Sequence, residues 1–169
     1  MKKVIILLSV FILIITGCEN IKNTPTAKVE EFLGKYQRMD MDVLEDLKNS
    51  INKDKTMNEE QKKDYQSLLE KQYQNLSYKI KKEEIRNSTA IVEVEIEVFD
   101  YQTSINHSKK YYQEHEKDNN NYIDYKLSEL KKVTSKVKKD LTFQLEKENN
   151  IWKIKELSKT DIEKIHGLY

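Results

Sequence analysis

The chain has 169 residues, of which 30 are Lys or Arg and 29 are Asp or Glu, so its formal net charge is +1. A balance this close to zero gives no electrostatic drive toward nucleic acid. Only three glycines and one proline occur, which excludes the glycine-rich phosphate loops and dinucleotide fingerprints of nucleotide-binding enzymes.

The N-terminal segment has the pattern of an export signal. Lys2 and Lys3 precede an apolar run from Val4 to Ile15, which only Ser9 interrupts. This run is too short to span a bilayer comfortably and has the length of a signal-peptide core. The ending Ile15-Thr16-Gly17-Cys18 resembles the bacterial lipoprotein signal, in which the cysteine thiol receives a diacylglycerol and becomes the mature N-terminus.

This resemblance implies a signal peptide over residues 1–17, lipid and palmitate on Cys18, and a lipidated tether over residues 18–24. Each buried CH₂ contributes about 0.8 kcal/mol, so two acyl chains anchor stably on the extracytoplasmic face of the cell membrane. Loss of Lys2 and Lys3 leaves 28 basic and 29 acidic residues, a formal charge of −1. The alternatives are a secretory signal with an incidental cysteine and an uncleaved membrane helix.

Three amphipathic helices are predicted after the tether. Thr24 and Pro25 have the residue types of a helix cap and first turn, and Asp42 is expected to open the second helix. Asn58 and Gln61 have the spacing of a capping box. The apolar stripes at helical spacing are Val29, Phe32, Leu33 and Tyr36; Leu44, Leu47 and Ile51; and Tyr65, Leu68, Leu69 and Tyr73.

The apolar period then changes from 3.6 to 2, which predicts strands. Leu76, Tyr78 and Ile80 alternate with polar residues, Asn87-Ser88 is a turn signal, and a second alternating run extends to Tyr101. The second run has one apolar side (Ala90, Val92, Val94, Ile96, Val98) and one polar side that carries Glu93, Glu95 and Glu97. Together the two runs predict a long hairpin.

Residues 102–131 are expected to be helical again and to be broken into two helices at Asp118-Asn119-Asn120-Asn121. A second hairpin follows, with Val137, Leu141, Phe143 and Leu145 alternating before a turn at Glu148-Asn149-Asn150. Trp152 and Ile154 lie on its last strand. Ser158 and Asp161 suggest a cap for a short final helix, which Gly167 closes.

This order predicts an α+β fold, in which helices cover the apolar face of a curved antiparallel sheet of about four long strands. The chain resembles the NTF2-like lipoproteins of low-GC Gram-positive bacteria, most of which have no assigned function. The resemblance covers residues 24–169 and depends on the lipoprotein signal, the hairpin from Tyr78 to Tyr101, and the segments Ile151 to Ile154 and Ile165 to Tyr169. It implies one NTF2-like cone domain over residues 25–169, with the helices of residues 102–131 as an insertion.

No catalytic or metal site is predicted, and no cofactor. The apolar strand face contains no acid or base, and the three strand glutamates point the other way. An acid from a helix, such as Asp64 or Asp124, is left open. His107 and His115 are about 12 Å apart along a helix, and His166 is expected to be a surface residue.

Two binding surfaces are considered. Tyr78, Val94, Phe143 and Trp152 are candidates for the lining of a cone pocket, although the same side chains could form a fully packed core. Tyrosines are concentrated at Tyr101, Tyr111, Tyr112, Tyr122 and Tyr125. Because tyrosine gives large contact area at low entropic cost, these residues could form a binding rim, or they could simply pack the insertion.

We therefore expect a lipid-anchored, non-enzymatic binding protein of the cell envelope, whose ligand is a small apolar or amphipathic molecule or a protein. An accessory or immunity-type interaction lipoprotein is the alternative, and a cone-fold enzyme is a weaker one. Homodimerisation is left open. It would require the row of Glu93, Glu95 and Glu97 to meet positive residues such as Lys136 and Lys138.

Overall fold

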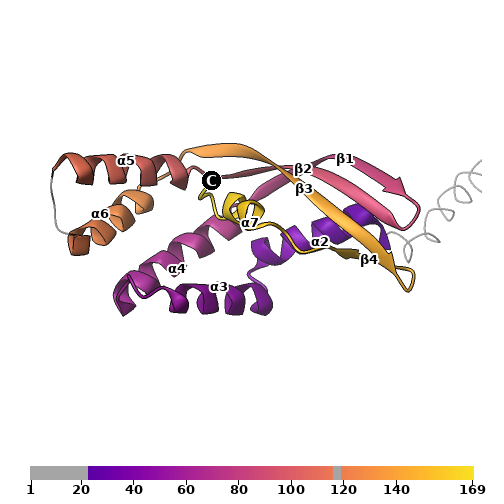
Figure 1. The fold of residues 1–169 in the computed structure, drawn as a ribbon, viewed down its shortest axis with the longest axis horizontal. Coiled ribbons are helices and arrows are strands. Elements are labelled where there is room, and N and C mark those ends of the chain that lie inside the picture. Colours follow the sequence, from indigo (N-terminus) through magenta and orange to yellow (C-terminus); the bar gives the residue numbers. More distant parts are fainter. Residues whose placement is uncertain (1–22, 116–118) are drawn as a thin grey trace, which may run out of the picture.

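The computed structural model describes residues 23–115 and 119–169, which form six helices and one four-stranded sheet. The expected signal peptide and Cys18 lie outside these residues. The helices are α2 (Pro25–Arg38), α3 (Met41–Lys53), α4 (Glu59–Gln74), α5 (Tyr101–Glu114), α6 (Asn119–Lys131) and α7 (Lys159–Ile165) (Figure 1). The strands are β1 (Ser77–Arg86), β2 (Thr89–Phe99), β3 (Lys136–Glu148) and β4 (Ile151–Ile154). The predicted α+β class is confirmed.

Local capping signals start two helices where the sequence predicts. The Thr24 hydroxyl accepts a hydrogen bond of 3.1 Å from the Ala27 N–H, and Pro25 lies in the first turn of α2. Asn58 and Gln61 form the predicted capping box of α4, in which each side chain accepts a 2.9 Å hydrogen bond from the other residue's backbone N–H.

The boundaries of α3 and α7 also follow local chemistry. Helix α3 begins one residue earlier than predicted, so Asp42 lies in its first turn, where a carboxylate interacts favourably with the helix dipole. The Ser158 hydroxyl caps α7 by accepting a 3.1 Å hydrogen bond from the Asp161 N–H. Gly167 follows with φ = 73°, a left-handed conformation that glycine adopts without strain.

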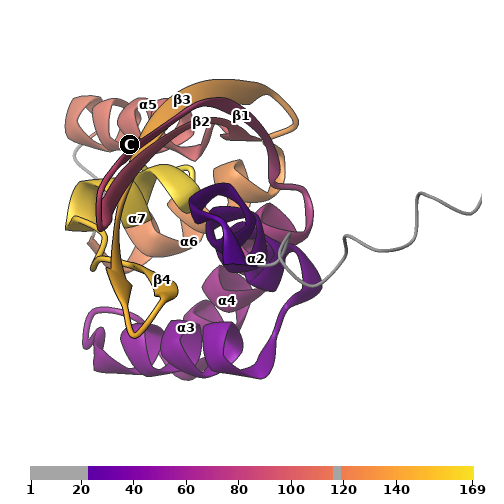
Figure 2. The same cartoon turned by 90° about the vertical axis from the view of Figure 1, so that its right-hand side faces the viewer.

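The strands form an antiparallel meander in the order β1-β2-β3-β4. Both predicted hairpins are present, and β2 pairs with β3 between them. The turn residues Asn87, Asn149 and Asn150 have φ angles of 53°, 47° and 64°, which asparagine tolerates better than most residues. The sheet is strongly curved, and it arches over α2 and α7 (Figure 2).

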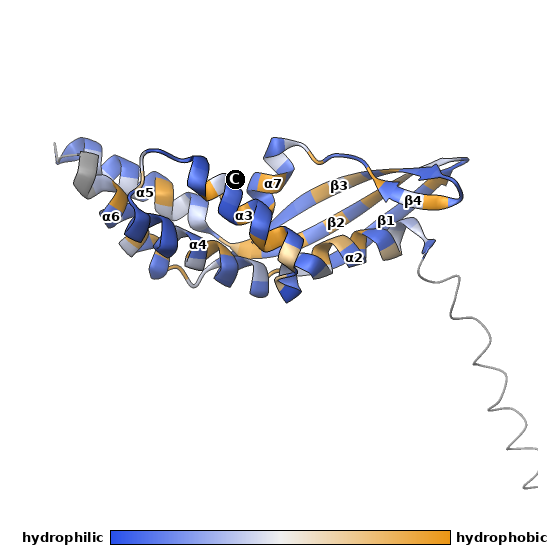
Figure 3. Ribbon diagram, turned by 90° about the horizontal axis from the view of Figure 1, so that it is seen from below, coloured by the Kyte–Doolittle hydropathy of each residue, from blue (hydrophilic) through white to orange (hydrophobic). Residues whose placement is uncertain are grey.

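The main core lies between the concave face of the sheet and the helices. The inward residues of β2 from Ala90 to Val98 are at most 4% exposed. They pack with Leu141, Phe143 and Leu145 of β3 and with apolar residues of α2, α3, α4 and α7. Burial of one such aliphatic or aromatic side chain contributes about 1.5–3 kcal/mol. Figure 3 shows hydrophobic residues alternating with hydrophilic ones along β2 and β3.

The outer face of the sheet carries paired charges. Glu95 contacts Lys81 at 3.2 Å and Lys138 at 2.8 Å, and Glu97 contacts Lys136 at 3.8 Å. Lys136 and Lys138, which a dimer would use to meet the glutamate row, therefore already pair with Glu97 and Glu95 within one chain. Homodimerisation stays a prediction.

Helices α5 and α6 form an antiparallel hairpin at one end of the molecule (Figure 1). A second cluster of buried residues joins its base to the rest of the fold, and it comprises Leu68, Phe99, Tyr101, Leu127 and Leu130. The break between the helices lies before Asn119, because Asn119 to Asn121 form the first turn of α6. Asparagine destabilises a helix little when it lies in the first turn, because the backbone N–H groups there have no partner within the helix.

The end of the molecule opposite this hairpin holds the first described residue. The Asn23 side-chain amide donates a 2.8 Å hydrogen bond to the Asn150 carbonyl, and its oxygen accepts one of 3.2 Å from the Trp152 N–H. The chain is thereby attached to the β3–β4 hairpin just before α2 begins. None of the helices within residues 23–115 and 119–169 is long and apolar enough to cross a bilayer.

Candidate binding groove between helices α3 and α7

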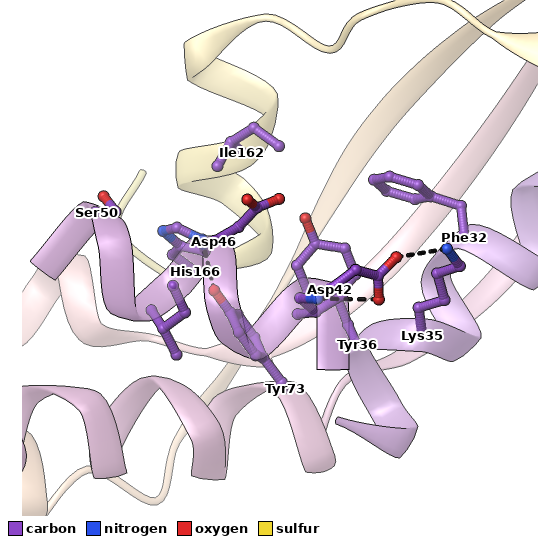
Figure 4. Close-up of a pocket in the computed structure, with 11 residues that line it drawn as sticks. Phe32, Lys35, Tyr36, Asp42, Asp46, Ser50, Tyr73, Ile162 and His166 are labelled. Carbon is purple, nitrogen blue, oxygen red and sulfur yellow. Dashed lines mark hydrogen bonds and ion pairs between the residues drawn. The ribbon is translucent and has the colours of Figure 1, made fainter. Parts of the chain in front are cut away.

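Two neighbouring cavities of about 360 and 540 Å³ form a groove between α3 and α7. Both cavities are lined by Leu47 and Ser50 of α3, by Ile162 of α7, and by His166 directly after α7. The first cavity is also lined by Phe32, Lys35, Tyr36, Asp42, Val43, Asp46 and Tyr73 (Figure 4). We call these two cavities together the groove.

One wall of the groove is formed by α7, which is held by contacts with α4 and β2. Gln72 is fully buried, and its side chain donates to the Ile165 carbonyl at 3.1 Å and accepts from the Phe99 N–H at 2.8 Å. Ile165 is also fully buried in the main core. A Cβ on Gly167 would lie 2.4 Å from the Phe99 carbonyl oxygen, so the segment after α7 approaches β2 as closely as only glycine permits.

The opposite wall belongs to α3, which rests on α4. Leu47 and Ile51 are its buried residues, and the spacing of four places them on one face. Asp42 and Asp46 have the same spacing and lie toward the first cavity. The two walls of the groove are therefore α7, which is held by α4 and β2, and α3, which is held by α4.

Aromatic rings form a continuous row along the floor of the first cavity. The Phe32 and Tyr36 centroids are 5.3 Å apart on successive turns of α2. Tyr36 meets Tyr73 of α4 edge-on at 4.9 Å, and Tyr73 lies 5.6 Å from His166. Phe32 in turn contacts Phe143 of the sheet at 5.7 Å. The row therefore connects the sheet with α7.

Burial sets the protonation of this row. The Tyr73 hydroxyl and His166 Nε2 share a hydrogen bond of 2.8 Å. Burial lowers the pKa of His166 to about 4, so the ring is neutral at neutral pH. Burial raises the pKa of Tyr36 to about 12, with Asp46 and Asp42 adding to the effect, and it raises the pKa of Tyr73 further. Both phenols stay protonated.

The mouth of the first cavity is acidic. Lys35 pairs with Asp42 at 2.6 Å, which lowers the pKa of Asp42 and raises the pKa of Lys35. Asp46 is exposed one turn further along α3. Figure 4 shows Asp42 and Asp46 projecting from α3 in front of Tyr36, Tyr73 and His166.

The groove provides recognition groups more readily than reaction groups. His166 Nε2 is engaged by Tyr73, and no hydrogen bond links His166 with Ser50 or Asp46. A nucleophile must lie within hydrogen-bond reach of its base. Within the described residues there is also no group of three His, Cys, Asp or Glu side chains that could hold a metal ion.

The four residues predicted to line a cone pocket lie elsewhere. Val94 and Phe143 are buried in the main core, at most 1% exposed, and Trp152 is 5% exposed. Phe143 borders a cavity of about 180 Å³ and Trp152 another of about 270 Å³. Tyr78 is half-buried against the core. No two of these four side chains border the same cavity, and none of them lines the groove.

The predicted rim tyrosines separate into two groups. Tyr101 is 1% exposed and donates a 3.1 Å hydrogen bond to the Leu68 carbonyl. The other four lie between α5 and α6, where Tyr111 stacks on Tyr125 at 4.8 Å and Tyr112 meets Tyr122 edge-on at 5.2 Å. We call these four rings the tyrosine cluster. It packs the two helices of the insertion against each other.

The helix acids and histidines considered from the sequence also have local partners. Asp64 pairs with Lys131 at 2.6 Å, and Asp124 accepts a 2.7 Å hydrogen bond from Gln61. His115 stacks on Tyr111 at 4.2 Å, and His107 is exposed. None of the four lines the groove.

Sequence reasoning missed the groove residues Tyr36, Asp46, Tyr73 and His166. The expectation that His166 is a surface residue is wrong, because α7 turns it inward onto Tyr73. The spacing of four in Phe32–Tyr36 and in Asp42–Asp46 was a readable signal. It would have shown an aromatic face and an acidic face on neighbouring helices.

Comparison with known proteins gives little further guidance. No protein-family model and no curated protein matches the chain. Among solved structures, it is similar to one described as a "putative lipoprotein (ycdA)" from Bacillus subtilis, with 17% sequence identity and a TM-score of 0.41. The match covers 65% of this chain and 38% of the other, so it spans well under half of that protein's length. A likeness this distant carries no argument about function.

Proposed function

We propose that the chain is a lipid-anchored protein of the cell envelope whose groove binds a small amphipathic molecule without converting it. The sequence ending in Cys18 supports the anchor, and the groove supports the binding role. We also propose that the domain is an NTF2-like cone, which is consistent with a curved antiparallel sheet that encloses helices on its concave side.

The observation that carries the binding role is the pair of cavities that meet at His166. Ligand sites are typically concave and mostly apolar, with a few polar groups that fix orientation. The groove has this composition: aromatic and aliphatic side chains form its walls, while Asp42, Asp46, Ser50 and Lys35 supply polar groups at one side. Cavities of about 360 and 540 Å³ are of the size that small ligands occupy.

Two measurements test this proposal. The native mass of residues 19–169, purified from a native-like host, should exceed the denatured mass by a few hundred daltons if a ligand is retained. A native mass equal to that of the bare chain would favour a protein partner instead. Replacement of Cys18 by Ser should abolish acyl labelling and release the protein from the membrane, and unchanged retention with unchanged labelling would contradict the lipid anchor.

A protein partner is the second candidate, because a large apolar side chain lies beside the groove. Met41 is 84% exposed at the first position of α3, next to Asp42, and a flexible exposed methionine suits adaptable protein contacts. Cross-linking through a photoreactive residue at position 41 in intact cells tests this candidate. A discrete cross-linked species of constant mass would support a protein partner. A smear of cross-linked species of many masses would count against it.

A further inference from the structure

The groove carries more negative than positive side chains. Asp42, Asp46, Asp54 and Glu163 line it, against Lys35 and Lys159. Lys35 pairs with Asp42 at 2.6 Å, and Lys159 lies 3.7 Å from Glu163. Both lysines therefore have an acidic partner, and two carboxylates remain.

These two carboxylates differ in their partners. Asp54 accepts hydrogen bonds from the backbone N–H and the hydroxyl of Thr56, at 2.7 and 2.6 Å. Asp46 has neither a hydrogen bond nor an ion pair to any residue in the described part of the chain. Its carboxylate lies at the edge of the first cavity, beside the aromatic row. It is thus the unmatched charge of the groove.

The aromatic row favours the same kind of ligand. Phe32, Tyr36 and Tyr73 come from two helices, and Tyr36 and Tyr73 meet at an interplanar angle of 90°. Tyrosine faces attract cations, and cages of such rings recognise quaternary ammonium groups. An anion would find only Lys35 and Lys159 in the groove, and both have acidic partners. His166 adds no positive charge because its ring is neutral at neutral pH.

We propose that the ligand of the groove is an organic cation, in which an ammonium or quaternary ammonium head is joined to an apolar body. This inference rests on the proposed binding function. The head would lie between Asp46 and the ring of Tyr36, with the buried Tyr73 ring behind Tyr36. The body would extend past Leu47 and Ile162 into the second cavity, which is the larger one.

Three water-soluble probes with the same apolar body test this inference: trimethyl(3-phenylpropyl)ammonium, 3-phenylpropane-1-sulfonate and 3-phenylpropan-1-ol. Calorimetric titrations use the lipidated mature chain, which begins at Cys18, in nanodiscs of zwitterionic lipid, with empty nanodiscs as the blank. We expect the ammonium probe to bind at least about tenfold more tightly than the other two, as a desolvated cation–π contact and an unpaired carboxylate together predict.

Matched variants locate the effect. Asp46→Asn should lower the affinity for the ammonium probe several-fold and leave the affinity for the alcohol unchanged. Glu45→Gln removes the same charge from the neighbouring exposed residue, which lines neither cavity, and should change neither probe. Tyr36→Leu replaces the aromatic ring by a smaller apolar side chain. It should therefore lower the affinity for the ammonium probe much more than the affinity for the alcohol. Thermal unfolding of each variant confirms that it folds.

The outcomes separate the two proposals. Equal affinities for all three probes, or tighter binding of the sulfonate or the alcohol, would overturn the cationic ligand and leave the binding groove standing. No binding of any probe would count against both. Equal loss of ammonium affinity in Asp46→Asn and Glu45→Gln would also overturn the inference. The cation would then be attracted by the overall negative charge of this surface and not by the groove.

Discussion

The tyrosine cluster and the aromatic row of the groove are both groups of contacting rings, but only the row borders a cavity among those described above. In the tyrosine cluster, rings from the facing helices α5 and α6 contact each other directly, with centroids 4.8 to 5.8 Å apart. In the groove, Tyr36 also contacts Tyr73 across two helices, at 4.9 Å, but together with Phe32 these rings border a cavity of about 360 Å³. A high local content of tyrosine therefore does not identify a binding surface. What distinguishes the two regions is that the groove rings border open space beside α3, whereas the rings of the tyrosine cluster lie between the two helices that carry them.

The largest effect should come from opening the tyrosine cluster. Tyr112 is 8% exposed and contacts both Tyr122 and Tyr125. Tyr112→Ala should lower the free energy of unfolding by about 3 kcal/mol, since the site loses buried aromatic area and ring contacts. Urea unfolding measures this. His107→Ala, at an exposed position of the same helix, should stay within about 0.5 kcal/mol. Similar values for both variants would mean that the cluster is not a closed core.

Acid should destabilise the folded protein through His166, which lines both cavities of the groove. The pKa of His166 is about 4 in the folded protein and near 6.5 in the unfolded chain. Between these values the unfolded chain binds a proton that the folded protein does not. Stability is therefore fully present above pH 6.5 and falls as the pH drops toward 4, by about 2 kcal/mol at pH 4.5.

Urea unfolding at pH 7 and at pH 4.5 measures this loss. His166→Gln should remove most of the pH dependence in that window, whereas His107→Gln should retain it. Carboxylates with lowered pKa, such as Asp42 and Glu31, contribute only as the pH falls through about 4 and below. A slope that survives His166→Gln would refute the assignment to this ring.

A smaller effect is expected from the hydroxyl that joins the aromatic row to α7. Tyr73→Phe removes the hydrogen bond to His166 and should cost about 1 kcal/mol. Tyr65→Phe is the matched control, because the Tyr65 ring borders the second cavity and its hydroxyl makes no hydrogen bond within the described chain. That change should stay within about 0.5 kcal/mol. If the two variants are equally stable, the hydrogen bond does not hold α7 in place.

The smallest effect should come from the ion pair at the mouth of the groove. Lys35 and Asp42 are in contact at 2.6 Å, but their side chains are 37% and 57% exposed. Exposed pairs contribute little because solvent screens them. Asp42→Asn should leave the midpoint of thermal unfolding unchanged within error. A clear drop would show that rim charges, and not the anchored helices, keep the groove open.

The regular elements were predictable because their signals are local. Thr24 with Pro25, and Asn58 with Gln61, cap helices through contacts three residues apart or fewer. The alternation in β2 fixes which side faces the helices, and the confirmed hairpins follow from it. The exact start of α6 was less predictable, because asparagine suits both a break and a first helical turn.

The groove was not predictable in the same way, because it depends on contacts between distant segments. Gln72 lies 93 residues from Ile165, and Tyr73 lies the same number of residues from His166. Nothing local to a glutamine in an amphipathic helix shows that it will be fully buried and bonded to two other elements. The tyrosines of the insertion show the same limit. Their residue type permits either an exposed binding rim or a contact between helices, and only the pairing of α5 with α6 determines which of the two they form.

The attachment of Asn23 to the β3–β4 hairpin has a mechanical consequence for a chain anchored through Cys18. The segment from Cys18 to Asn23 can extend about 17 Å at most. Tension on such an anchor would load α2 through the backbone, and it would load the β3–β4 hairpin through the two Asn23 hydrogen bonds, of which one reaches β4, an edge strand of only four residues. Such a load would strain the β3–β4 hairpin before β1 and β2, and it would reach Trp152, which shares a cavity with the groove residues Phe32 and Lys35.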